Sequence, residues 1–305
     1  MIEEPFPPLP YAEWRATKDT LHLWLQIVGK IRLTLQPRLN HWWHVPLYVF
    51  SRGLTTRAIA YGEDLADIEF DFVAHELVVS TSRGDRRSFS LHDGLSVASF
   101  YRQVFAIFDE LGIDCDLRKP VPYEHPTSKL PLPTDEEHRS YDRDAVERYW
   151  RILVTLQRPF EEFHGRFIGK SSPVHLFWHG FDVALTRFSG RPAPIREGAG
   201  MVEAEAYSHE VISFGFWAGD DLYPAPAFYT YTAPMPEGLT DEPLASGGKW
   251  SDYRGGILGL LPYDDVRTAP DPRQALLDFL ESAYRAGAKR AKWDVEAFEP
   301  RPLTR

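Results

Sequence analysis

The segment RKPVPYEHPTSKLPLPTDEEHRSY, residues 118–141, divides this chain of 305 residues into two parts. Its prolines fix φ and remove backbone hydrogen-bond donors, so most of residues 119–134 should be extended and non-helical. We therefore predict an N-terminal half over residues 11–117 and a C-terminal half over residues 142–298, joined by a proline-rich linker over residues 118–141.

The residue patterns before and after the linker predict the same order of elements: a helix, four strands and a helix. In the N-terminal half, apolar residues recur at helical spacing over residues 18–36 and 97–108, and Gly112 marks the end of the second helix. The segments between are aromatic and β-branched and indicate antiparallel strands. They are HWWHVPLYVF (41–50), RGLTTRAIAYG (52–62), ADIEFDFVAHELVVSTS (66–82) and RRSFSL (86–91).

In the C-terminal half, helices are predicted over residues 143–168, with a kink at Pro159, and over residues 274–291. The strands between them are VHLFWHGFDVALTRF (174–188), HEVISFGFWAG (209–219), AFYTYTAP (227–234) and GGILGLLPY (255–263). Strands flanked by helices predict an α+β fold of two similar halves with mainly antiparallel sheets. His44 and His175 are identical residues 131 positions apart, as are Phe50 and Phe181, which suggests an internal duplication.

Composition and charge exclude several classes of protein. The 34 basic and 44 acidic residues give a net charge of −10. Proteins that bind nucleic acid usually carry an excess of basic residues, so this charge argues against that class. No apolar run approaches the roughly 18 residues of a membrane span, and the N-terminus MIEEPFPPLP does not resemble a secretory signal. We expect a cytoplasmic protein that binds neither nucleic acid nor membrane. Cys115 is the only cysteine, so no intrachain disulfide can form, and the oligomeric state is left open.

Eleven histidines raise the question of a metal site. His175 and His179 lie in a segment that alternates like a strand, where four residues span about 13 Å, too far for both rings to bind one ion. A divalent metal would need ligands from several segments, and His44, His175 and either His209 or Glu210 are the candidates. The alternative is that each histidine is buried and hydrogen-bonded to carbonyl groups.

Tryptophans and cations near these histidines indicate a ligand pocket. Trp43 and Trp178 could form the walls of a pocket that stacks a flat or apolar molecule, or they could simply be core residues. Lys170 and Arg187 lie beside the aromatics in the sequence and suggest a small carboxylate or phosphate ligand. The alternative for Arg187 is an exposed strand-end residue paired with a carboxylate.

These residues give a specific site hypothesis. If a pseudo-twofold axis relates the halves, His44 and His175 approach one another near it, and a neighbouring strand supplies His209 and Glu210. Trp43 and Trp178 would then be walls, with Arg187 anchoring an anion. We expect an enzyme that acts on a small organic molecule, with histidine as acid, base or metal ligand. The alternatives are a small-ligand-binding protein without chemistry and a protein-interaction module.

Four stretches carry a resemblance to a known family. NHWWHVPLYV (40–49), RGLTT (52–56), GKSSPVHLFWHGFDVALTRFSGRPAP (169–194) and EAYSHEVISFGFW (205–217) resemble the bacterial family called domain of unknown function 5996. The resemblance runs from about Trp14 to Trp293. It implies no activity, cofactor or catalytic residue. His179 departs from it, because the resemblance leads us to expect a glycine near that position.

Overall fold

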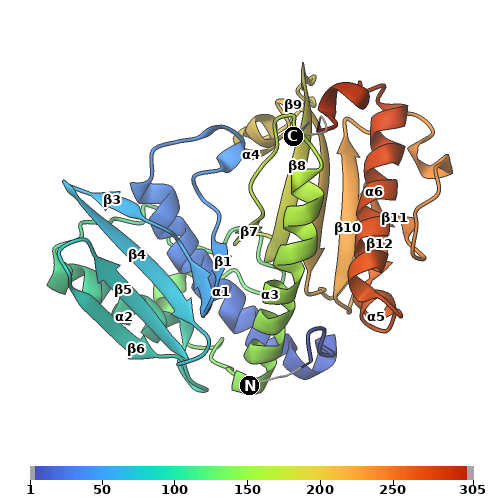
Figure 1. Ribbon diagram of the computed structural model, residues 1–305. Coiled ribbons are helices and arrows are strands. Elements are labelled where there is room, and N and C mark those ends of the chain that lie inside the picture. Colours follow the sequence, from blue (N-terminus) through green and yellow to red (C-terminus); the bar gives the residue numbers. More distant parts are fainter. Residues whose placement is uncertain (1–3, 301–305) are drawn as a thin grey trace, which may run out of the picture.

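The helix and strand patterns on either side of the linker each produce one sheet with its own helices. The computed structural model describes residues 4–300. Within them the chain forms six α-helices and two antiparallel six-stranded sheets (Figure 1). The predicted α+β class with antiparallel sheets is confirmed.

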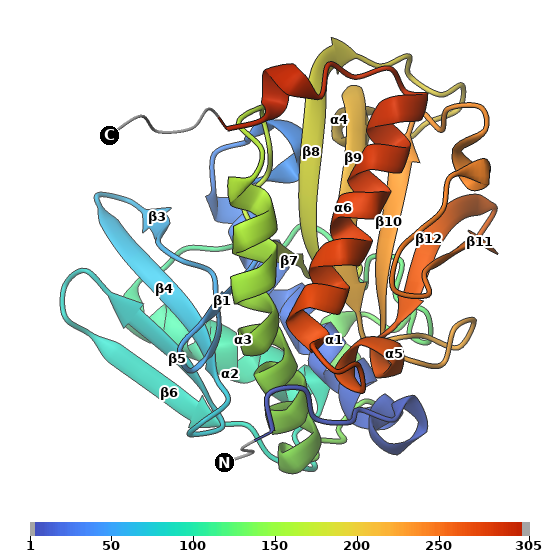
Figure 2. The ribbon, with the colours of Figure 1, turned by 45° about the vertical axis from the view of Figure 1, so that its right-hand side comes forward.

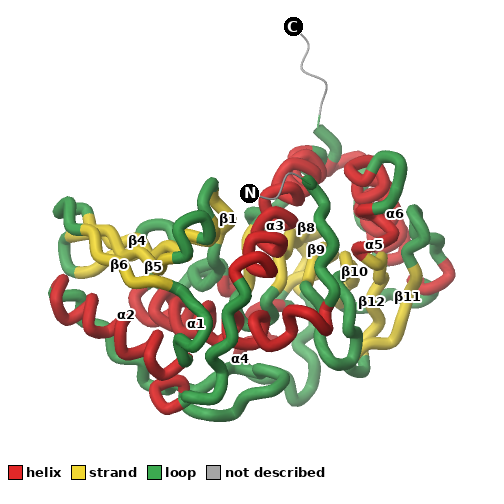
Figure 3. Tube along the Cα trace, turned by 90° about the horizontal axis from the view of Figure 1, so that it is seen from below, coloured by secondary structure: helices red, strands yellow, loops and turns green. Residues whose placement is uncertain are grey.

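The first sheet has the strand order β1-β2-β4-β5-β6, and β3 pairs with β4. The strands are β1 (Tyr48–Phe50), β2 (Gly53–Thr55), β3 (Ile59–Tyr61), β4 (Asp64–Asp71), β5 (Glu76–Thr81) and β6 (Arg86–Ser90). Helices α1 (Tyr11–Leu35) and α2 (Val97–Leu111) lie on one side of this sheet (Figure 3). The ring of Phe70 stacks on Phe100 of α2 with 5.9 Å between centroids. Gly112 ends α2 in the left-handed conformation, with φ 68°, as predicted.

The second sheet has the order β11-β12-β10-β9-β8-β7. Its strands are β7 (His175–Phe177), β8 (Asp182–Pro192), β9 (His209–Trp217), β10 (Ala227–Ala233), β11 (Lys249–Tyr253) and β12 (Gly256–Pro262). One helix precedes these strands in the chain, α3 (Arg143–Gly165), and two follow them, α5 (Tyr263–Arg267) and α6 (Pro272–Arg290). Helices α3 and α6 lie across one face of the sheet (Figure 2). The apolar stripe of α3 meets this face, where the ring of Phe163 lies 4.8 Å from that of Phe214.

Short helices complete the chain. They are α4 (Met201–Ala206) and the 3₁₀-helices η1 (Asn40–Trp42), η2 (Leu132–Thr134), η3 (Leu239–Asp241) and η4 (Glu296–Phe298). Helix α4 contacts η1, on the side of the second sheet away from α6 (Figure 3). No helix within residues 4–300 is both long enough and apolar enough to cross a membrane.

The two sheets meet at one edge. Leu47, just before β1, and Leu176 of β7 exchange two backbone hydrogen bonds of 2.8 Å. Buried side chains from both sheets and from α1 form one continuous hydrophobic core. The division into halves at residues 118–141 and the internal duplication stay predictions.

Local structure differs from the sequence prediction at three places. Each sheet has six strands, where four were predicted for each half. HWWH is not a strand, because His41 and Trp42 have positive φ values of 55° and 61° and form the η1 turn. The predicted strand over residues 174–188 is broken after Phe177 by a turn that includes Phe181, with φ 54°. Aromatic residues favour strands, but here tertiary packing holds them in turns.

The proline-rich segment behaves as expected. Between α2 and α3 the chain forms only the three-residue η2, so the prediction that residues 119–134 are mostly non-helical is confirmed. Helix α3 contains Pro159 and continues to Gly165, so the predicted helix persists past this residue.

Candidate functional site

A cavity of about 660 Å³ lies against the face of the second sheet that α3 and α6 do not cover. Its walls come from the end of α1, the turn 41–45, the segment 116–123, the β7–β8 turn, strands β8 to β10, and α4. Aromatic rings dominate these walls. They belong to Trp42, Trp43, Tyr123, Phe177, Trp178, Phe188, Tyr207, Tyr229 and Tyr231. Residues from both predicted halves therefore line one cavity.

The alternation of side chains along the strands decides which groups face the cavity. Every second residue lines it, namely Asp182, Ala184, Thr186 and Phe188 in β8, Val211 and Ser213 in β9, and Tyr229 and Tyr231 in β10. The residues between them, such as Phe214, pack against the helices. The hydroxyl groups of Thr186 and Ser213 lie 2.9 Å apart and hydrogen-bond to each other across the strands.

Asp182 is the acidic group enclosed in this aromatic wall. Its carboxylate accepts a hydrogen bond of 2.5 Å from the Tyr229 hydroxyl. Burial raises the pKa of Asp182 to about 6, although the hydrogen bond from Tyr229 opposes the shift. No basic side chain within residues 4–300 forms an ion pair with it. The carboxylate can therefore hold or release a proton near neutral pH.

A second, smaller cavity of about 320 Å³ adjoins the first at Asp182. Four residues line both cavities and therefore lie at the boundary between them: His179, Asp182, Tyr229 and Tyr231. His179 lies in the turn between β7 and β8, and burial lowers its pKa to about 4. Its ring is therefore neutral at pH 7 and can act as a hydrogen-bond donor and acceptor.

Trp178 forms a wall because α1 has a glycine opposite it. A Cβ atom on Gly29 would lie 2.1 Å from the indole of Trp178, so only glycine leaves room for the ring. Lys30, the next residue of α1, has its Nζ 5.6 Å from the centre of the same indole. This half-buried ammonium group stands at the α1 side of the cavity, and burial lowers its pKa.

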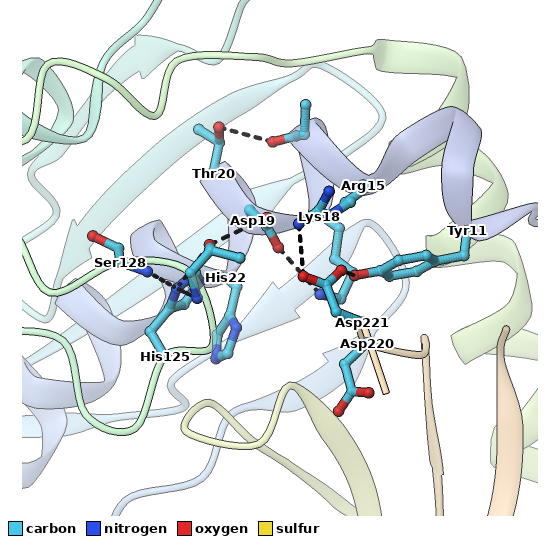
Figure 4. A network of polar contacts seen from close by, with 12 residues as sticks. Tyr11, Arg15, Lys18, Asp19, Thr20, His22, His125, Ser128, Asp220 and Asp221 are labelled. Atoms are coloured by element: carbon cyan, nitrogen blue, oxygen red, sulfur yellow. Dashed lines mark hydrogen bonds and ion pairs between the residues drawn. The ribbon is translucent and has the colours of Figure 1, made fainter. Parts of the chain in front are cut away.

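The linker closes one side of the cavity, and α1 holds it there. The buried amide of Gln26 donates to the Tyr123 carbonyl at 3.0 Å and accepts from the Tyr123 N–H at 2.7 Å. Further along, His125 Nδ1 accepts from the backbone N–H of Ser128 at 3.1 Å (Figure 4). Tyr123 lines the larger cavity, so these bonds fix part of its wall.

The same network extends along the N-terminal part of α1 (Figure 4). Lys18 and Asp19 form a buried ion pair of 3.2 Å. At the first turn, Tyr11 and Arg15 donate to the carboxylate of Asp221 at 2.9 and 2.6 Å. Helix α1 therefore contacts both the linker and the loop that follows β9.

The predicted histidines have separate surroundings. His44 Nδ1 accepts from the backbone N–H of Leu39 at 3.2 Å, and burial lowers the pKa of His44. His175 is buried beside Phe177, and its ring nitrogens have no hydrogen-bond partner within residues 4–300. The ring of His209 lies 5.6 Å from that of His41, which was not among the predicted site residues.

Glu210 and Arg187 lie away from the cavity. Glu210 accepts hydrogen bonds from Arg191 and from the indole N–H of Trp293 at 3.1 Å. Arg187 points to the helix side of β8, where its guanidinium stacks 3.6 Å from the centre of the Phe163 ring. It is 1% exposed, so it is not the solvated strand-end residue considered as the alternative.

The predicted tryptophans do line the cavity, and Lys170 lies just behind it. Trp43 and Trp178 are both wall residues. Lys170 Nζ is 2.7 Å from His41 Nε2 and 5.4 Å from the centre of the Trp43 ring. The cation thus contacts two residues of the wall without lining the cavity itself.

Sequence reasoning missed Asp182 and the tyrosines of β10. The sequence places Asp182 in a predicted strand without a functional role. A carboxylate at the start of an apolar alternating segment nevertheless indicates a buried charge, which is costly unless it is paired or hydrogen-bonded. Tyr229 and Tyr231 alternate in AFYTYTAP, which shows that they share a face but not that the face is open. Within residues 4–300, no group of three or more His, Cys, Asp or Glu side chains is placed to hold a metal ion.

Comparison with known proteins gives a family but no activity. The chain belongs to a family of unknown function, DUF5996, which matches residues 6–300. No curated protein and no solved structure gives a significant match.

Proposed function

We propose that this member of the DUF5996 family binds a small organic molecule with a flat, largely apolar body in the 660 Å³ cavity. The observation that carries the proposal is the combination of this aromatic cavity with one enclosed carboxylate, that of Asp182. Ligand cavities typically measure about 300–1,000 Å³ and combine apolar walls with a few polar groups that orient the ligand.

The polar groups support a single orientation for such a ligand. On the sheet, Asp182, Thr186 and Ser213 place a carboxylate and two hydroxyl groups on one wall. On the α1 side, the ammonium of Lys30 lies 5.6 Å from the centre of the Trp178 ring. An apolar body between the tryptophan walls would therefore meet hydrogen-bonding groups on the sheet and an ammonium group on the α1 side.

Acid–base catalysis is the second candidate. It is favoured by the pKa of about 6 for Asp182, because a general acid or base works best when its pKa lies near the working pH. In this case the predicted roles of His44 and His175 pass to Asp182, with His179 as its neutral neighbour in the cavity wall. A non-catalytic binding protein and an enzyme would share the same cavity.

Calorimetric titration tests whether the cavity binds ligand. Three probes share one aromatic body and differ in charge: 2-(1-naphthyl)ethylamine, 2-(1-naphthyl)ethanol and 1-naphthaleneacetic acid. At least one should bind with one-to-one stoichiometry. Ala184→Leu adds three carbons inside the cavity and should weaken that binding at least tenfold.

Ala12→Leu is the matched control, because Ala12 is exposed on α1 and outside the cavity. It should bind the probes like the unmodified chain. If none of the probes binds, or if Ala184→Leu binds as well as Ala12→Leu while both remain folded, the proposed function is wrong.

A further inference from the structure

We propose that the cavity recognises its ligand through a protonated amine, which the Asp182 carboxylate pairs with and the rings of Tyr229 and Tyr231 surround. This inference rests on the proposed function and names the chemical class of its ligand. It concerns residues that had no role in the sequence-based site.

The carboxylate of Asp182 has unused hydrogen-bonding capacity. An ionised carboxylate can accept about four hydrogen bonds. Among side chains, only Tyr229 within residues 4–300 donates to it. No basic side chain within residues 4–300 forms an ion pair with Asp182, and no charged group contributes to the shift of its pKa. A ligand that brings a cation and several N–H donors would supply both missing partners.

The rings around this carboxylate suit a cation. Tyr229 and Tyr231 lie parallel, with 8° between their planes and 6.2 Å between centroids. The hydroxyl of Tyr207 donates to that of Tyr231 at 3.2 Å, and Trp217 lies 6.0 Å from the Tyr229 ring. Ring faces carry negative potential, and a cation within about 6 Å of a ring centre is attracted to them.

Burial keeps these phenols neutral. It raises the pKa values of Tyr229 and Tyr231 well above the ordinary value for tyrosine. The tyrosines therefore contribute ring faces and hydroxyl dipoles and do not add negative charge. Asp182 then supplies the enclosed negative charge of the cavity, and Asp116, the other carboxylate that lines it, is exposed to water.

The cations at the rim favour the opposite ligand, an anion, and they must be weighed against Asp182. Arg118 and Lys119 are exposed, so water and salt screen their charges. Lys30 is half-buried, but its ammonium already lies over the Trp178 ring. Asp182 is enclosed, where a charge interacts several times more strongly than at the surface. The enclosed carboxylate therefore decides the sign of the preferred ligand.

The three naphthyl probes separate this inference from the proposed function, because they differ only in charge. We expect 2-(1-naphthyl)ethylamine to bind at least about tenfold more tightly than 2-(1-naphthyl)ethanol, and 1-naphthaleneacetic acid to bind more weakly than the alcohol. Asp182→Asn keeps the size of the side chain and removes its charge. It should bring the affinity for the amine down to that for the alcohol and leave the affinity for the alcohol within about threefold.

Asp109→Asn is the matched control, since it removes one negative charge from an exposed position of α2. It should preserve the preference for the amine. If the alcohol or the acid binds as tightly as the amine, or if Asp182→Asn keeps the full preference, the amine inference is wrong and the cavity still binds ligand. If no probe binds to any variant, both the inference and the proposed function are wrong.

Discussion

The hydroxyl of Tyr229 in β10 reaches the carboxylate of Asp182 in β8, with 2.5 Å between the oxygens, across the intervening strand β9. This contact exists because β9 has a glycine between them. In the strand register, Gly215 is opposite both Tyr229 and Ala184. A Cβ atom on Gly215 would lie 2.3 Å from the Tyr229 ring and 2.3 Å from the Val183 carbonyl oxygen.

Replacing Gly215 with alanine should therefore destabilise the protein and displace the Tyr229 ring from Asp182. Overpacking of this kind typically costs about 1–3 kcal/mol of unfolding free energy. Urea denaturation measures that loss. Gly165→Ala is the control, because a Cβ there meets nothing within 4 Å, and its stability should change by less than about 0.5 kcal/mol. Equal stability of the two variants would contradict this role for Gly215.

Replacing Gln26 with leucine should loosen the linker. The substitution keeps the size of the side chain but leaves the N–H and carbonyl groups of Tyr123 without their partner. We expect a loss of about 1–3 kcal/mol in unfolding free energy. Amide hydrogen exchange should also become faster in residues 120–128. The same substitution at Gln157, in α3, serves as the control, and unchanged exchange in the linker of Gln26→Leu would show that this contact does not hold it.

Buried histidines should make stability fall in acid. Burial lowers the pKa of His175 to about 3 and that of His125 to about 4, while both take up a proton near pH 6.5 in the unfolded chain. The unfolded state therefore binds more protons between about pH 6.5 and pH 4. These histidines stabilise the fold above pH 6.5, and that stabilisation is lost as the pH falls through the window.

Asp182 acts in the opposite direction. Its pKa is about 6 in the folded chain and about 3.9 in the unfolded chain. Its contribution to the free energy of unfolding is therefore complete below pH 3.9 and is lost as the pH rises to 6. Thermal melting at pH 4.5 to 7 should show the net loss in acid, and His125→Gln should reduce its slope. His92→Gln, at an exposed position, should leave the slope unchanged. A melting temperature independent of pH would contradict this account.

Arg187 should matter for stability and not for ligand binding. Its guanidinium donates to the Phe163 carbonyl and stacks on the rings of Phe163 and Tyr284, and burial lowers its pKa to about 10. The Phe163 carbonyl also accepts from the Arg166 N–H, so it keeps a partner without Arg187. Arg187→Met preserves volume and should cost less than about 1.5 kcal/mol.

Arg187→Ala should cost about 2–5 kcal/mol, because it leaves a cavity among the aromatic rings. Both variants should bind the naphthyl probes like the unmodified chain. Loss of probe binding in a folded Arg187→Met would restore the prediction that this residue anchors an anion.

Several features could be predicted from local sequence because they depend on nearby residues. Gly112 ends α2, since glycine adopts positive φ without strain. The prolines of residues 119–134 keep that segment out of helix.

The candidate site depended on contacts between residues distant in sequence. Trp43 and Trp178 could be proposed as walls from their neighbours, but their shared cavity requires the left-handed turn at His41 and the turn after Phe177, which local propensity does not indicate. The role proposed for Asp182 depends on its contact with Tyr229, 47 residues away, and on the glycine between their strands.

The sequence by itself determined the fold class, the end of α2 at Gly112 and the non-helical linker, because periodicity, glycine and proline act within a few residues of their own position. It did not predict the start of α1, which begins at Tyr11 and not at residue 18. Only the tertiary structure decided which side chains face the cavity and which enclosed carboxylate has no ion-pair partner within residues 4–300. Strand alternation shows which residues share a face, but burial, charge pairing and cavity shape arise when β8, β10 and α1 come together. For this reason the proposed site centres on Asp182, and the predicted site at His44 and His175 stays a prediction.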